Sequence, residues 1–256
     1  ALTVRYWIKD YATNVEGAIT KTYPAFDYEK NDYYDMTANI NVTDYDGSKY
    51  YMWDAQKNYW NGHEWNSANP WQPVLTGKNN SNYPVSGSSY FHMTEGFGRE
   101  DAMNSSFKDL PNANEIAWYA EKGDARWDGE RIWTTMGHLY KGGMWFKNKA
   151  FIKLTESYSD SFGPGIYGDM RDNGGTINKK PAQGAPVVFA ERYFFLPALG
   201  FYANGFFDKI GEKGFYWSSS ADPTNSSWAY SIEFDKNNVK AAPNSSSYGI
   251  YVGNFE

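Results

Sequence analysis

Hydrophobic and polar residues alternate over several short stretches of the chain, which is the pattern of strands that bury one face. Trp228, Tyr230, Ile232 and Phe234 stand two apart and therefore share one face of a C-terminal strand. The strands predicted in this way are residues 4–8, 40–42, 50–53, 144–154, 215–220, 228–234 and 248–252.

Helix signals are fewer. Asn112 is a good N-cap, Glu115 stands three residues later as in a capping box, and Gly123 ends the pattern. A second short helix is predicted near Glu130–His138.

Asp46-Gly47 is a strong hairpin signal, and it predicts that residues 50–53 return along the preceding strand.

Turns and loops separate these elements. Turn signals stand at Asp222-Pro223, Asn237-Asn238 and Pro243-Asn244, and residues 58–89 and 156–186 are long loops rich in Gly, Pro, Asn and Ser. The pattern predicts an α+β protein with loop-rich antiparallel sheets and about two short helices.

Composition changes this picture mainly through its aromatic residues. Among 256 residues are 22 Tyr, 16 Phe and 11 Trp, so aromatic side chains are the expected core material. The net charge of −6 and the pI near 5.2 argue against a nucleic-acid partner. The chain contains no run of 18 apolar residues, so no transmembrane helix is predicted. The absence of cysteine excludes disulfides.

Two motifs in the C-terminal third carry a family resemblance. Phe195–Tyr202 reads FLPALGFY and Gly214–Ser220 reads GFYWSSS; an Asn/Ser-rich stretch, an alternating strand and a closing element at Tyr248–Gly253 follow. The helix start Leu110–Glu115 fits the same pattern. This arrangement resembles the C-type lectin-like fold, and more narrowly the variable proteins of diversity-generating retroelements and the related major paralogous domain surface proteins of bacteria.

The resemblance implies a display scaffold. Residues 41–256 would form a single C-type lectin-like domain with long inserted loops, and residues 1–40 an N-terminal strand or attachment segment. The expected function is non-enzymatic binding of a protein or glycan on another cell or particle, by a bacterial or phage protein that is extracellular or at the cell surface. A signal peptide or lipid anchor would precede Ala1.

The region 202–248 is rich in Tyr, Trp, Asn and Ser, the residue types that antibody loops use for rigid contact area and adaptable hydrogen bonds. Trp228 and Tyr230 share a strand face with apolar Ile232 and Phe234, so a core position is the alternative for both. The predicted ligand-binding residues are Tyr202, Asn204, Ser219, Asp222, Asn225, Ser226, Ser227, Trp228, Tyr230, Asn237, Asn238, Asn244, Ser246 and Tyr248.

Other aromatic residues favour a structural role. Trp217 is expected to fill the core rather than to contact ligand. The loop that carries Trp53, Tyr59, Trp60, Trp65 and Trp71 could stack on sugars, but a satellite core under a long loop is the favoured interpretation.

Two alternative functions remain open. A fimbrial tip adhesin would show an unpaired edge strand near residues 1–10. A carbohydrate-active enzyme would need two carboxylates about 5–10 Å apart in a cleft, and no motif selects two of the many Asp and Glu residues.

A cofactor or metal is not expected. His63, His92 and His138 are scattered without metal-ligand spacing. A structural calcium ion is the alternative, for which Glu156, Asp169, Asp172 and Asn173 are the candidate ligands.

Overall fold

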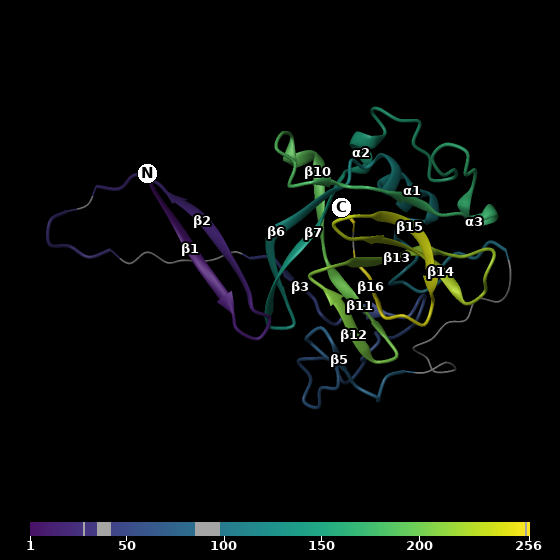
Figure 1. Cartoon of the computed structure of the whole chain (residues 1–256), viewed down its shortest axis with the longest axis horizontal. Coiled ribbons are helices and arrows are strands. Elements are labelled where there is room, and N and C mark those ends of the chain that lie inside the picture. Colours follow the sequence, from purple (N-terminus) through teal and green to yellow (C-terminus); the bar gives the residue numbers. More distant parts are fainter. Residues whose placement is uncertain (28, 35–41, 85–97, 254) are drawn as a thin grey trace.

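A six-stranded sheet forms the centre of the fold in the computed structural model, which describes residues 1–27, 29–34, 42–84, 98–253 and 255–256 (Figure 1). In spatial order its strands are β4 (Tyr50–Tyr51), β16 (Ile250–Tyr251), β13 (Gly214–Ala221), β14 (Trp228–Phe234), β15 (Val239–Ser245) and β8 (Ile177–Lys179). The pairs are antiparallel except for β13 with β16, which is parallel. The predicted strands over 215–220 and 228–234 are confirmed.

Helix α1 (Ala113–Lys122) packs on strands β13, β14, β15 and β8 of this sheet. The predicted capping box is present: the Asn112 side chain accepts from the Glu115 backbone N–H at 3.1 Å, and the Glu115 carboxylate accepts from Asn112 N at 2.9 Å. Gly123 follows at the C-cap. Local sequence signals therefore placed the only α-helix longer than four residues in the described part of the chain.

The central sheet is buried on both faces, so β13 is buried at every position. Tyr216 and Ile232 face the cluster that includes α1, whereas Phe215 and Trp217 face a second cluster with Trp53. The largest fully buried side chains are all Trp, Tyr or Phe, which confirms the expected aromatic core and the core position of Trp217.

Two smaller sheets complete the body. The second has the order β10 (Tyr193–Pro197), β7 (His138–Lys147), β6 (Arg126–Thr135) and β3 (Asp44–Tyr45), with β9 (Ala182–Gln183) also pairing with β6. The third has the order β11 (Leu199–Ala203), β12 (Phe206–Ile210) and β5 (Lys78–Asn79). The short helical turns are α2 (Lys149–Ile152), α3 (Met170–Asn173) and the 3-10 helix η1 (Ala190–Arg192). The chain is therefore sheet-rich with few helices, as an α+β fold requires.

The second predicted helix, Glu130–His138, is wrong. These residues form the end of β6, a turn at Met136-Gly137, where both residues have positive φ, and the start of β7. Alternate burial of Trp133 and Thr135 shows the period of a strand.

Three further local predictions need correction. The strand expected over 144–154 ends at Lys147, after which α2 begins. The turn at Asp46-Gly47 exists, but β3 and β4 on either side of it join different sheets. The turn predicted at Pro243-Asn244 is wrong, because Pro243 lies within β15. Strand β8 no longer pairs with β15 at this point, so the N–H that proline lacks is not needed for a hydrogen bond between these two strands. The predicted strand at 40–42 lies mostly outside the described residues.

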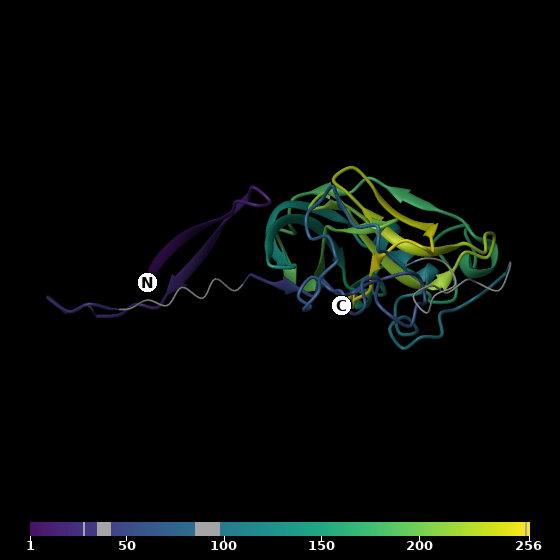
Figure 2. The same cartoon turned by 90° about the horizontal axis from the view of Figure 1, so that it is seen from below.

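Strands β1 (Leu2–Asp10) and β2 (Val15–Tyr23) form a hairpin that projects from the body (Figures 1 and 2). Its turn is anchored at the β6–β7 hairpin. Thr13 Oγ1 donates to Leu139 O at 2.9 Å, and the Asp10 carboxylate accepts from Leu139 N at 3.0 Å and lies 2.9 Å from His138 Nδ1. The two strands pair only with each other among the described residues.

Candidate ligand-binding face

The link from β13 to β14 is a turn held by its own backbone and side chains. Asp222 N donates to Trp228 O at 3.0 Å, and the Asp222 carboxylate accepts from Thr224 N at 2.9 Å. Asn225 Oδ1 accepts from Ser227 N at 3.0 Å. Asp222 is only 5 % exposed, so its side chain is part of the turn. The turn fixes the position of Trp228.

A second segment, residues 245–248, lies beside this turn. Ser246 N and Ser246 Oγ both donate to Ser227 O, at 2.9 and 3.0 Å, and Trp53 N donates to Ser246 O. Tyr248 N donates to Ser245 O at 3.0 Å. Ser246 is buried, so its hydroxyl joins the two segments instead of facing solvent.

A third segment, residues 98–103, runs along the outside of the same end of the sheet. Gly98 N donates to Pro223 O, and Ala102 N donates to Ser219 O at 2.7 Å. Met103 is 82 % exposed here. The sequence pattern does not predict that this segment reaches the site, because long-range contacts with β13 and with Pro223 bring it there.

Side chains that stay accessible around this end of the sheet form a polar-aromatic surface, which we call the rim. Trp228 is 42 % exposed, an unusual position for so large an apolar side chain. Tyr248 is half-buried and packs on Phe201, with ring centroids 5.4 Å apart. The rim consists of Asn225, Ser226, Ser227, Trp228, Ser245, Ser247 and Tyr248.

The prediction that Tyr202 and Tyr230 contact ligand is wrong, because both side chains are fully buried. Tyr202 OH donates to Pro73 O at 2.6 Å and accepts from Gln72 Nε2 at 3.0 Å. Tyr230 OH donates to Gly175 O at 2.9 Å. Burial raises the pKa of both hydroxyls, which keeps them protonated as donors within the core.

Several predicted contacts lie elsewhere or serve the scaffold. Ser219 is buried beside residue 102, as Asp222 and Ser246 are buried in their turns. Asn244 is half-buried and donates to Ser231 Oγ at 2.8 Å. Asn237 and Asn238 form the turn at the opposite end of β14, and Asn204 occupies the tip of the β11–β12 hairpin. The structure thus brings together Asn225, Ser226, Ser227, Trp228 and Tyr248 from the predicted set.

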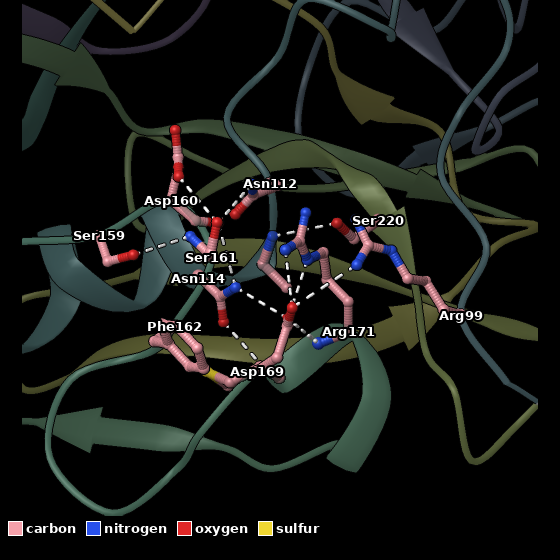
Figure 3. A network of polar contacts seen from close by, with 12 residues as sticks. Arg99, Asn112, Asn114, Ser159, Asp160, Ser161, Phe162, Asp169, Arg171 and Ser220 are labelled. Atoms are coloured by element: carbon pink, nitrogen blue, oxygen red, sulfur yellow. Dashed lines mark hydrogen bonds and ion pairs between the residues drawn. The ribbon is translucent and has the colours of Figure 1, made fainter.

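A polar network centred on Asp169 supports this end of the molecule (Figure 3). Its carboxylate accepts from Arg171 Nε at 2.8 Å and from Asn114 Nδ2 at 2.9 Å, and lies 3.6 Å from Arg99 Nη1. Burial alone would raise the pKa of Asp169, but these partners lower it to about 2. Ser220 Oγ accepts from the first amide of α1, Ala113 N, at 3.1 Å. The network therefore ties α1 and α3 to segment 98–103.

The same network includes Asp169, one of the candidate ligands for a structural calcium ion. Two arginines supply the positive charge opposite Asp169, and Glu156 pairs instead with Lys122 at 3.6 Å. No group of three or more His, Cys, Asp or Glu side chains within the described ranges is arranged to hold a metal ion.

Neither described histidine belongs to a group of three or more candidate metal ligands among the described residues. The His63 ring lies flat on Trp71, and His138 contacts Asp10. His92 lies outside the described residues.

The two alternative functions stay predictions. Both outer edges of the β1–β2 hairpin lack a strand partner among the described residues, as an attachment segment of a tip adhesin requires. A pocket of about 200 Å³ is lined by three carboxylate residues, Asp109, Glu115 and Glu256. However, Glu115 already accepts from Lys149 Nζ at 2.6 Å and from Tyr158 OH at 3.0 Å.

Comparison with known proteins identifies no relative of this chain. No family model, no curated protein and no solved structure matches the chain. Within the part of the chain that the structure describes, none of the helices has the length and hydrophobicity needed to cross a bilayer.

Proposed function

We propose that the protein is a non-enzymatic binding protein that recognises a protein or glycan on another cell or particle through the rim. Its scaffold would be a C-type lectin-like domain related to the variable proteins of diversity-generating retroelements, displayed outside the cell or at its surface. The observation that carries the proposal is Trp228, which is 42 % exposed within a group of Asn, Ser and Tyr side chains on a backbone fixed by hydrogen bonds.

The architecture of the rim supports exchangeable side chains. Ser227 O accepts from Ser246 N, a backbone contact that any residue at these two positions provides, and the buried Ser246 hydroxyl adds a second hydrogen bond to the same oxygen. Replacing an exposed side chain on such a backbone changes the surface chemistry and leaves the core packing intact, with stability effects within about 0.5 kcal/mol per surface site. Tyr and Trp then supply rigid contact area, and Asn and Ser supply adaptable hydrogen bonds.

A substitution experiment tests the proposal. The chain, labelled with a fluorophore, is screened against bacterial cells and glycan arrays, and the strongest ligand is retained. Changing Asn225, Ser227, Trp228, Ser247 and Tyr248 together to Ala should reduce affinity at least about a hundredfold, since central Trp and Tyr contacts each contribute about 2 kcal/mol or more. The melting temperature should change by no more than a few degrees.

The turn at the opposite end of β14 provides the matched control. Changing exposed Asn237 and half-buried Asn238 to Ala removes two amides of the same type and should leave binding unchanged. Retained binding by the rim variant, or equal loss in both variants, would refute the proposal.

The encoding locus provides a separate test of diversification. A nearby reverse transcriptase gene and a near-copy of the 3′ coding end that differs only at adenines are expected. A locus without both would show that the rim is not diversified by a retroelement.

A further inference from the structure

A small pocket lies in the long loop that precedes residue 85, apart from the rim. Four aromatic side chains, Tyr59, Trp60, Trp71 and Tyr83, line it together with the amides of Asn61 and Asn82. Its volume is about 210 Å³, which corresponds to about seven water volumes. Pockets for drug-sized ligands typically measure about 300–1,000 Å³, so this one has room for a single ring.

The aromatic walls are fixed by the core beneath them. Tyr59 stacks on the buried Tyr202 at 5.6 Å between ring centroids, and Trp60 meets the same ring edge-on at 5.6 Å. The His63 ring lies flat on Trp71, with centroids 3.3 Å apart and planes 5° apart. The backbone carbonyl of Trp71 accepts from Asn80 Nδ2 at 3.0 Å. The site is therefore preformed, and little conformational entropy would be lost in ordering its side chains when a ligand binds.

One buried donor in this pocket has no partner. Trp60 is 4 % exposed, and its Nε1–H forms no hydrogen bond with any described residue. A buried N–H without an acceptor is destabilising, and such groups are rare in folded proteins. At the mouth of the same pocket the Asn82 side chain is exposed. The site thus offers aromatic faces, an unused donor and an accessible amide.

We infer that this pocket binds one sugar ring of a glycan. A pyranose presents an apolar C–H face that packs against an aromatic ring, while its hydroxyl groups exchange hydrogen bonds with the exposed Asn82 amide at the mouth. A proline or aromatic side chain of a peptide would also fill the volume, but it would offer that amide no hydrogen-bond partner.

The site also explains the position of one predicted contact. Asn204 stands next to Gly205 at the tip of the β11–β12 hairpin, and Gly205 packs against Asn80 and Tyr83. Gly205 N donates to the Tyr59 hydroxyl at 3.2 Å. Asn204 therefore belongs to the surroundings of this pocket and not to the rim.

Saturation-transfer NMR on the full chain tests the inference. The probes are the methyl glycosides of glucose, galactose, mannose, fucose, N-acetylglucosamine and N-acetylgalactosamine, with N-acetyl-prolinamide and N-acetyl-tryptophanamide as peptide probes. At least one glycoside should bind with a millimolar Kd. Trp71→Ala should weaken it at least about tenfold, and Asn82→Ala should weaken it about threefold, since each removes one contact.

The matched control is Trp7→Ala, which removes an accessible indole of β1, 65 % exposed, and should leave glycoside binding unchanged. Asn82 has an exposed side chain, so Asn82→Ala decides the matter if Trp71→Ala does not fold. The inference fails if no glycoside binds, if both pocket variants bind like the unchanged chain, or if only the peptide probes bind. It is independent of the rim, because none of the residues that line the pocket belongs to the rim.

Discussion

At the residue scale, tyrosine has two distinct roles in this chain. Buried tyrosines fill the core with their rings and donate their hydroxyls to backbone carbonyls, which removes the cost of burying a polar atom. Five of them do so: Tyr50 to Leu199 O, Tyr140 to Val74 O, Tyr202 to Pro73 O, Tyr216 to Pro197 O and Tyr230 to Gly175 O. Half-buried Tyr248 instead lies in the rim. Residue type alone cannot separate the two roles, which is why Tyr202 and Tyr230 were mistaken for contacts.

The core role of Tyr202 makes a specific prediction. Tyr202→Phe keeps the ring but leaves Pro73 O and Gln72 Nε2 without this partner, so the free energy of unfolding should fall by about 1–2 kcal/mol. Urea unfolding followed by fluorescence measures the change. Tyr248→Phe is the matched control and should change stability by less than about 0.5 kcal/mol. Equal, small effects in both variants would contradict the buried hydrogen bonds.

At the scale of elements, predictions succeeded where the signal is local. The capping box of α1 lies within four residues, and the alternation of β14 within seven. Predictions failed where the structure depends on residues that are distant in the sequence. Strands β3 and β4, for example, flank one turn but belong to different sheets. The segment at 98–103 reaches the site only through its pairing with β13. Such pairings are set by the packing of the whole core, which a single sequence pattern does not encode.

The β1–β2 hairpin gives an element-scale prediction that depends on pH. Burial alone would raise the pKa of Asp10, but hydrogen bonds from Leu139 N, His138, Ala12 N and Thr13 N lower it from 3.8 to about 2. Because the folded pKa is lowered, the anchoring is complete above about pH 4 and is lost as the pH falls toward 2. The Leu139 amide shift in NMR should titrate with a midpoint near 2.

Two variants complete this experiment. Asp10→Asn should abolish the acid titration of the Leu139 amide and speed hydrogen exchange across residues 2–23. Asp46→Ala, which removes a carboxylate from an exposed turn, should leave both unchanged. An unaltered exchange rate in the Asp10 variant would show that the hairpin is held by something other than this carboxylate.

At the scale of the whole molecule, the hairpin and the body differ in how they are stabilised. Both hydrophobic core clusters of the described residues consist of residues from 45 onward, so the body buries its aromatic core without β1 or β2. The hairpin touches the body near its turn, through Asp10, Thr13 and the approach of Gly17 to Ile132. A two-stranded hairpin is marginally stable by itself. The body and the hairpin are thus stabilised separately, and an attachment segment ahead of one binding domain stays a prediction.

A chain lacking residues 1–23 tests this division. It should keep the near-ultraviolet circular dichroism of the packed aromatic core, and its melting temperature should fall by only about 2–4 °C, because about 1 kcal/mol of anchoring is lost. Ligand binding by the rim should be unchanged. If the hairpin is the attachment arm of a tip adhesin, the shortened chain should no longer join the fibre, since strand addition needs the free edges of β1 and β2. Loss of the circular dichroism signal would show instead that the hairpin is part of the folding unit, and attachment and recognition would then not be separable.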